Sequence, residues 1–371
     1  MDGQKPLVFA LGSNGSGQLG IGHKEDVSVP KPAIFHPNTP DSVVIQYATG
    51  GNHTLLLFQS GELFYSGDSS TGACGLVAQS EVPVFREVRL RRGNERFGTI
   101  VQIAATWEAS FILSLDEDGK RTKLYSFGIG MKGELGLGEL IIRTPEATQI
   151  KDFPPPNTQI IELSAAMGHV VTVLDNGDAY GWGNCRKGQA GEPSGVIAVP
   201  RKIEGIGFEV KRAVCCKETT CFLGEPEEGR IAVLGSDKGK LKSEAPNNVR
   251  AWKDISSSWG NIFILKEDGS LHGWGRDDQG QIPPPNVSPL SKIAAGSEHV
   301  VALTKESDVI SWGWGEHGNC GPTVENNVVK GRWNILAASR FLPPSTYIHS
   351  IGAGCATSWV CIASLPDTTN S

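Results

Sequence analysis

Two glycine-rich segments have the residue spacing of a dinucleotide-binding loop. Residues 15–20 (GSGQLG) and 313–318 (GWGEHG) both match GxGxxG after a short apolar run. In a dinucleotide site, these glycines let the backbone approach a pyrophosphate held at the N-terminus of the next helix. Neither match precedes a stretch with helical periodicity. We therefore interpret the glycines as turn residues with positive φ and predict no bound cofactor.

Histidine and cysteine are the other residues that could support chemistry. His53, His169 and His299 could contribute to a metal site or to an acid–base centre. The eight cysteines contain no CxxC pair and follow no disulfide framework, so we interpret them as reduced thiols. We find no GxSxG, HExxH or P-loop motif and no His/Cys ligand spacing. The sequence predicts neither a metal site nor an enzyme.

The glycines belong to a repeat that occurs seven times. Two or three apolar residues, a glycine, several polar residues and a second glycine recur along the chain. The glycines that end each apolar run, here called anchor glycines, are Gly12, Gly67, Gly128, Gly183, Gly235, Gly275 and Gly313. A second element, made of small residues, a polar tip and a short apolar run, also occurs seven times. Its copies are residues 47–57, 103–113, 163–174, 213–223, 255–265, 293–303 and 351–361.

The apolar runs have the length and the boundaries of β-strands. They lie between Gly, Asn, Asp and Ser residues, and Asn176-Gly177 and Asp268-Gly269 are typical of hairpin turns. The first element opens the chain without its partner, and the second closes it. We therefore predict that residues 8–11 pair with the segment 347–363, so that one blade contains both ends of the chain and the ring has no open edge.

The repeats resemble those of the RCC1 (regulator of chromosome condensation) family. The motif is a glycine, His-Ser/Thr, a strand, a glycine turn, Trp-Gly and Gly-Gln-Leu-Gly, and segments 50–67 and 293–313 fit it best. The resemblance covers about residues 7–363 and implies an all-β, seven-bladed RCC1-like propeller closed by its N- and C-terminal strands. We expect a single domain over residues 1–371. The repeat with Thr219-Thr220 and Leu234-Gly235 is degenerate.

The resemblance also implies a loop face that binds partners. In the RCC1 protein this face carries histidines and acidic residues that engage the Ran GTPase. Here the His-Ser/Thr position is filled by His53, Ala109, His169, Thr219, Asn261, His299 and Thr357, and Glu108, Glu218 and Glu298 precede three of these. Equivalent positions lie around the axis of a ring rather than converging, so we favour hydrogen-bonded structural histidines with a partly exposed edge. Nucleotide exchange stays an alternative.

Tryptophans divide into two groups. Trp182, Trp274 and Trp312 precede anchor glycines, so we interpret them as core between blades. Trp107 and Trp259 fall at variable loop positions, and Trp314 follows a repeat glycine. Large aromatic residues at loop tips are frequent interface anchors. We predict partner binding by at least one of these three, with Glu316 and His317 beside Trp314 as further candidates, and coverage of an irregular loop is the alternative.

Charge and hydropathy limit the other classes of partner. Lys and Arg total 34 and Asp and Glu total 40, a net charge of −6. The chain has no terminal basic run, so we expect no direct DNA binding and no membrane binding. The segment 86–96 contains five arginines, and a solvated loop or a contact with an acidic partner would both suit it. The N-terminus does not have the apolar stretch of a signal peptide, which predicts a cytoplasmic and nuclear protein.

Within the family, the chain is most similar to the fungal killer-toxin-insensitivity group of small stand-alone propellers. That resemblance implies a non-catalytic heterodimer with a small CSL-type zinc-finger protein. The pair would serve diphthamide synthesis and Elongator-dependent modification of wobble uridine in tRNA, with Elongator or a small GTPase as further partners. The alternative function is that of a guanine-nucleotide exchange factor for a Ran-like GTPase.

Overall fold

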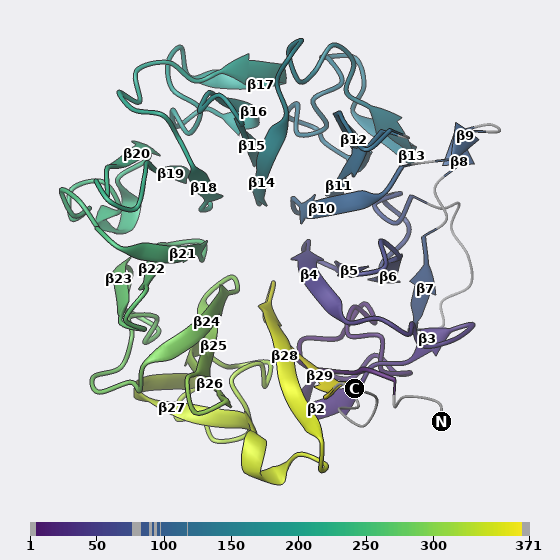
Figure 1. Ribbon diagram of the computed structural model, residues 1–371, viewed down its shortest axis with the longest axis vertical. Helices are drawn as coiled ribbons and strands as arrows, with labels where there is room; N and C mark the ends of the chain where they lie inside the picture. Colours follow the sequence, from purple (N-terminus) through teal and green to yellow (C-terminus); the bar gives the residue numbers. More distant parts are fainter. Residues whose placement is uncertain are drawn as a thin grey trace, which may run out of the picture.

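Seven β-sheets stand side by side around a central channel (Figure 1). The computed structural model describes residues 5–75, 83–88, 91–92, 95–96, 98–116 and 118–365. Within these residues the only helical segments are two 3-10 turns, Lys238–Lys240 and Ser339–Phe341. The predicted all-β, seven-bladed propeller is confirmed.

Each sheet is one blade, and its strands follow one another in order from the channel to the circumference. The innermost strands are β28 (Thr346–Ala353), β4 (Val44–Thr49), β10 (Ile100–Ala105), β14 (Ile160–Ala166), β18 (Arg212–Cys215), β21 (Trp252–Ser257) and β24 (Leu290–Ala295), of blades 1 to 7 in that order. The second strands are β29 (Thr357–Ser364), β5 (His53–Phe58), β11 (Ala109–Leu115), β15 (His169–Leu174), β19 (Thr219–Leu223), β22 (Asn261–Lys266) and β25 (His299–Thr304).

The third strands are β1 (Leu7–Gly12), β6 (Leu63–Gly67), β12 (Thr122–Ile129), β16 (Ala179–Cys185), β20 (Ile231–Gly235), β23 (Leu271–Gly275) and β26 (Asp308–Trp314). Five blades have an outer strand: β2 (Val27–Pro32), β7 (Phe85–Glu87), β13 (Arg143–Gln149), β17 (Gly195–Lys202) and β27 (Val328–Ala338). In addition, β3 (Phe35–His36) pairs with β7, and β8 (Arg91–Arg92) pairs with β9 (Glu95–Arg96). Blades 5 and 6 have three strands each, and blade 5 contains the degenerate repeat.

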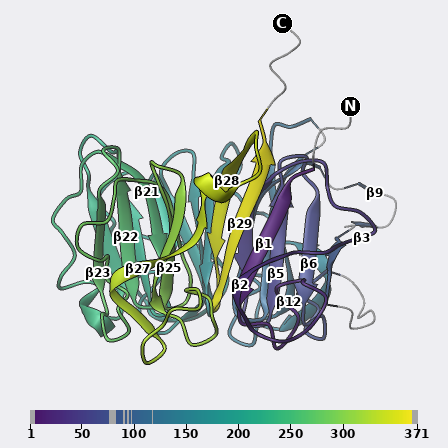
Figure 2. The same cartoon turned by 90° about the horizontal axis from the view of Figure 1, so that it is seen from below.

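The two ends of the chain complete blade 1 together. Strand β1 lies between β2 and β29, and its antiparallel register with β29 runs from Leu7 opposite Ile362 to Gly12 opposite Thr357. Figure 2 shows β1 and β29 next to each other in the side view. The predicted closure by the terminal strands is therefore confirmed.

The strand order gives the ring two different faces. At one face, here called the loop face, the innermost strand of each blade connects to the second strand. The anchor glycine at the end of each third strand lies at the same face. At the opposite face, here called the hairpin face, second strands turn into third strands, for example at Gly61 and Gly177. All seven variable loop positions of the repeat therefore lie on the loop face.

The anchor glycines adopt a backbone conformation that other residues avoid. Their φ angles lie between 102° and 117°. Each pairs with the first residue of the second strand of its own blade. A Cβ added to any of them would lie 2.2–2.6 Å from the carbonyl oxygen just before that strand. The same oxygen accepts a hydrogen bond of 2.6–3.1 Å from the residue after the glycine. Glycine is therefore required sterically at all seven positions.

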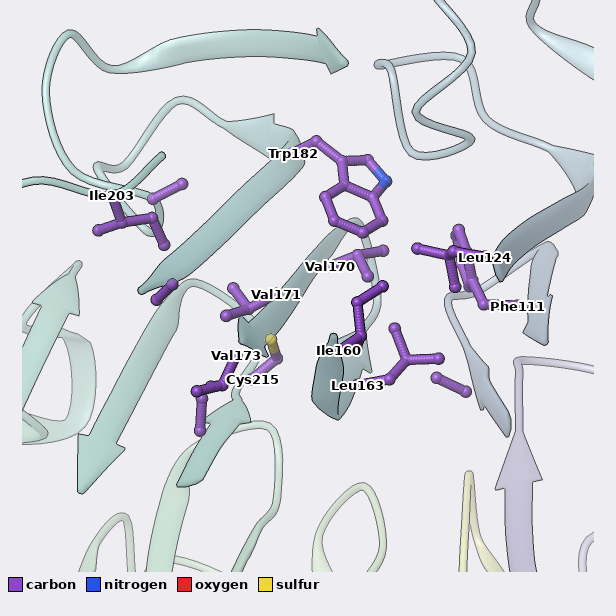
Figure 3. Packing of buried hydrophobic residues seen from close by; sticks show 14 of the residues in the cluster. Phe111, Leu124, Ile160, Leu163, Val170, Val171, Val173, Trp182, Ile203 and Cys215 are labelled. Atoms are coloured by element: carbon purple, nitrogen blue, oxygen red, sulfur yellow. The ribbon is translucent and has the colours of Figure 1, made fainter. Parts of the chain in front are cut away.

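The tryptophans before the anchor glycines form the core between blades, as predicted. Trp182 and Trp312 have no exposed surface and Trp274 is 5% exposed. Each indole N–H donates to a main-chain carbonyl of the preceding blade, for example Trp182 to Glu134 at 2.8 Å. Figure 3 shows Trp182 above Val170 and facing Phe111 and Leu124 of blade 3. The hydrogen bonds satisfy buried N–H groups and hold neighbouring blades in register.

We expect Gly128→Ala to destabilise the propeller more than Gly138→Ala does. Both glycines have positive φ, 110° and 99°, but a Cβ at Gly128 would lie 2.3 Å from the Glu108 carbonyl oxygen, whereas a Cβ at Gly138 meets nothing within 4 Å. Backbone strain alone should cost Gly138→Ala about 1–2 kcal/mol, and the added clash should bring Gly128→Ala above about 3 kcal/mol. Urea-induced unfolding measures both, and equal midpoints would contradict the steric argument.

Candidate interaction surface at the mouth of the channel

Main-chain hydrogen bonds join the loop tips around the mouth of the channel. The Gly51 N–H donates to the Trp107 carbonyl at 2.9 Å, and the Trp107 N–H donates to the Met167 carbonyl at 3.0 Å. On the other side, the Lys217 N–H donates to the Trp259 carbonyl at 3.1 Å and the Trp259 N–H to the Ser297 carbonyl at 2.9 Å. These bonds tie Trp107 and Trp259 each to the loops on both of their sides, so the main chain that carries the two indoles is held in place.

Trp107 and Trp259 meet across this mouth. They come from blades 3 and 6, on opposite sides of the channel, and their ring centroids are 6.0 Å apart with planes tilted by 47°. Trp107 lies against Gly51, where a Cβ would be 2.5 Å from its Cε2 atom, and 38% of Trp107 is exposed. The Lys217 Nζ lies 5.2 Å from the centre of the Trp259 ring, a cation–π arrangement. The sequence singled out both tryptophans but carried no sign that they touch.

A cavity of about 310 Å³ runs into the channel from the two indoles. All seven blades line it, mostly through small residues such as Ala104, Ala166, Ser257 and Ala295. The side chains of the mouth thus surround a hollow rather than a filled core. Such a site can receive a protruding side chain of another molecule.

The three histidines of the repeat lie inside the ring. His53, His169 and His299 are 3%, 0% and 1% exposed, so they do not have the partly exposed edge that the sequence suggested. The Nε2 atom of each lies 2.9–3.0 Å from a hydroxyl of the next blade: Ser110, Thr220 and Ser358, respectively. Burial lowers the pKa of each histidine to about 4, so the rings are neutral at pH 7. Their hydrogen bonds connect neighbouring blades.

Two of the three predicted acidic residues, Glu298 and Glu108, differ most in exposure. Glu298 is buried, and its carboxylate accepts hydrogen bonds from Arg276 at 2.7 Å and from the Gln281 Nε2 at 2.8 Å. It therefore links blades 6 and 7. Glu108 is exposed next to Trp107 at the mouth and is the one of the two that a partner could reach.

Trp314 ends β26, the third strand of blade 7, and Glu316 and His317 lie in the loop between this strand and the outer strand. The Trp314 ring is half-buried, with its centroid 5.4 Å from that of His317, and Glu316 is exposed. The His317 Nδ1 lies 2.7 Å from the Asp26 Oδ2, so this loop contacts the loop that follows β1. Trp314 does not line the channel cavity. The structure therefore separates it from the Trp107–Trp259 pair.

Other predictions concern residues that the structure describes only in part. The arginine-rich segment 86–96 includes strands β8 and β9, but residues 89–90 and 93–94 and the side chains of 91–97 lie outside the described part.

Within the described residues, no three His, Cys, Asp or Glu side chains are grouped so that they could hold a metal ion. In the same part of the chain, no helix is long and apolar enough to cross a membrane.

Comparison with known proteins places the whole ring in one family. The family described as the RCC1-like domain matches residues 7–360. An RCC1 repeat-containing protein of Schizosaccharomyces pombe is 31% identical over 96% of this chain and 99% of its own length. The secretion-regulating guanine nucleotide exchange factor of Mus musculus is 26% identical over 97% of this chain and 84% of that protein.

Solved structures share the fold. Prp20p of Saccharomyces cerevisiae superposes with a TM-score of 0.78 at 20% sequence identity, covering 98% of this chain and 93% of that chain. Human WBSCR16 superposes with a TM-score of 0.77 at 16% identity, covering 98% and 100%. At these identities the likeness concerns the propeller itself.

We expect the free energy of unfolding to depend on pH through the buried histidines. The pKa of His299 is about 4 in the folded protein and 6.5 in an exposed chain. Between pH 6.5 and 4 the unfolded chain binds a proton that the folded chain does not, so stability is retained above pH 6.5 and falls as the pH drops through this window, by about 1 kcal/mol per pH unit for each histidine.

The variant His299→Asn tests this dependence, because blade 6 carries Asn261 at the equivalent position. Its urea midpoint should be lower than that of the unchanged protein at pH 7.5 and should decline less steeply between pH 6.5 and 4.5. The same decline in both proteins would show that His299 is not kept neutral.

Proposed function

The chain belongs to the RCC1-like domain family, and from that premise we propose that residues 1–371 act as a single, non-catalytic interaction propeller whose partner docks at the mouth of the channel. The observation that carries this proposal is the Trp107–Trp259 pair. Two indoles meet from opposite blades over a hollow, in loops held by main-chain hydrogen bonds. Aromatic anchors in a rigid frame lose little conformational entropy on binding, which favours a stable interface.

The partner that we propose is a small CSL-type zinc protein in a heterodimer. A rigid ring can present its loops to a small globular partner over a standard interface, which buries about 1,600 Å² in total. Through this partner the propeller would support diphthamide biosynthesis and the Elongator-dependent modification of tRNA wobble uridine, in the cytoplasm and the nucleus. The similarity to the small stand-alone members of the family and the partly exposed aromatic pair support this proposal.

We expect Trp107→Ala and Trp259→Ala each to weaken the complex with the zinc protein about 30-fold, equivalent to about 2 kcal/mol. Isothermal titration calorimetry with the purified partner measures the affinity. Trp314→Ala, outside the channel mouth, should have a smaller effect. Phe341→Ala is the matched control, because Phe341 is 79% exposed in the 3-10 turn after β27, on the hairpin face.

Two results would contradict the proposal. The first is that the zinc protein does not bind the unchanged propeller. The second is that Trp107→Ala and Trp259→Ala bind it as tightly as Phe341→Ala does. Thermal unfolding of each variant shows whether a loss of affinity arises at the surface, because partly exposed side chains should change the midpoint little.

Guanine-nucleotide exchange on a Ran-like GTPase is the second candidate function. The observation that favours it is Glu108, an exposed carboxylate at the mouth of the loop face, together with the exchange-factor name of the mouse relative. Against it, the repeat histidines are buried and Glu298 is paired with Arg276.

We expect the propeller to leave the release of labelled GDP from Ran-like GTPases within about twofold of the intrinsic rate, because Glu108 alone supplies little of an acidic and histidine-rich surface. Stopped-flow fluorescence measures the release. An acceleration of tenfold or more that Glu108→Ala abolishes would overturn the interaction-only function and establish exchange activity.

A further inference from the structure

A groove of about 280 Å³ continues from the channel mouth across blade 4. Its lining residues are Lys132, Glu134, Met167, Gly168, Asn184, Arg186, Lys187, Gln189, Lys217 and Glu218. They belong to blades 3, 4 and 5, and all except Asn184 of β16 lie in loops. Met167 lines both this groove and the channel cavity, and Lys217 reaches from the groove to the Trp259 ring. The groove and the aromatic pair therefore form one continuous surface.

The groove carries more positive than negative charge. Lys132, Arg186, Lys187 and Lys217 are all exposed, whereas Glu134 and Glu218 are half-buried. The Glu134 carboxylate already accepts a hydrogen bond of 2.6 Å from the Lys132 main-chain N–H. Four cations and two carboxylates lie together in a protein whose net charge is −6. This local excess of positive charge is thus opposite in sign to the charge of the whole chain.

The cations of this groove also lack the ion pairs found elsewhere on the loop face. In the described part of the chain, none of the four lies within 4.0 Å of a carboxylate in a salt bridge. By contrast, Arg276 pairs with Asp278 and Glu298, and Lys330 pairs with Asp277. The groove side chains are therefore available to carboxylates from another molecule.

We propose that this groove binds an acidic segment of a partner protein. Carboxylates of the segment would pair with Lys132, Arg186 and Lys187, and an apolar side chain in the same segment would contact Met167 and the indole pair. This inference rests on the proposed function, because it assigns the kind of partner segment that the loop face accepts.

A peptide suits the groove better than a nucleic acid does. Glu134 and Glu218 lie among the cations, so a phosphate backbone with a charge on every residue would meet them along its length. A peptide can place apolar or neutral residues opposite these two carboxylates. The apolar side of the groove at Met167 also favours a chain that alternates acidic and apolar side chains.

The test uses the full chain and a fluorescein-labelled eight-residue peptide of alternating glutamate and leucine, followed by fluorescence anisotropy. Lys132→Glu/Lys187→Glu reverses two groove charges. Lys120→Glu/Lys305→Glu makes the same change of net charge at exposed turns of the hairpin face and is the matched control. A labelled single-stranded RNA of ten nucleotides is the second probe.

We expect the groove variant to bind the peptide at least about tenfold more weakly than the unchanged chain, and the control variant to stay within about twofold. Raising the NaCl concentration from 20 to 300 mM should weaken binding to the unchanged chain more than to the groove variant. Equal loss in the groove and control variants would overturn the proposal, because only net charge would then matter. Tighter binding of the RNA than of the peptide would overturn it in favour of a nucleic-acid groove.

The same variants separate this inference from the proposed function. If the CSL-type zinc protein binds the unchanged chain and the groove variant equally well, the groove proposal fails while the interaction at the mouth stands. If the zinc protein does not bind at all but the peptide binds in a groove-dependent manner, the proposed partner is wrong and the acidic-segment site is supported.

Discussion

The contact between each anchor glycine and the carbonyl just before the second strand determines the geometry of the loop face. Seven times around the ring, a backbone with φ above 100° brings the end of the third strand within hydrogen-bond distance of the start of the second. A Cβ would occupy the space of that carbonyl oxygen. The loop from the innermost to the second strand ends at this contact, so the contact fixes where each of the seven loops enters its second strand.

Side chains at the two ends of that contact join the blades. The tryptophan before an anchor glycine donates back to the preceding blade, as Trp312 does to Gln281, and the histidine opposite the glycine reaches the next blade, as His299 does to Ser358. The Ser358 hydroxyl donates to the Asn319 carbonyl, so it accepts from the histidine Nε2–H. The histidines, which could act as catalysts in an open site, connect neighbouring blades in this protein. The side chains at the loop tips are the ones that a partner can contact.

Repetition explains what the sequence could predict. The pairing of β1 with β29, the anchor glycines and the buried Trp182 all follow from a pattern that recurs at equivalent positions. The burial of the histidines did not follow: Gly50 and Gly296 leave space for the rings of His53 and His299, yet His169 is just as buried with Ala166 at the equivalent position. A position in the repeat defines the place of a residue in its blade, but it does not define how far its ring penetrates.

The repeat in the sequence also did not predict the contacts between side chains across the channel. Trp107 meets Trp259 because two long side chains extend from blades on opposite sides, while Gly51 and Ser297, at the adjoining tips of blades 2 and 7, are small. The groove depends in the same way on loops of three successive blades whose sequences vary independently. The ring thus holds its variable residues in a fixed frame. Because the loops are already ordered, most of the conformational entropy lost on binding is that of the partner. The affinity then depends on how well the charges of the partner match those of the groove.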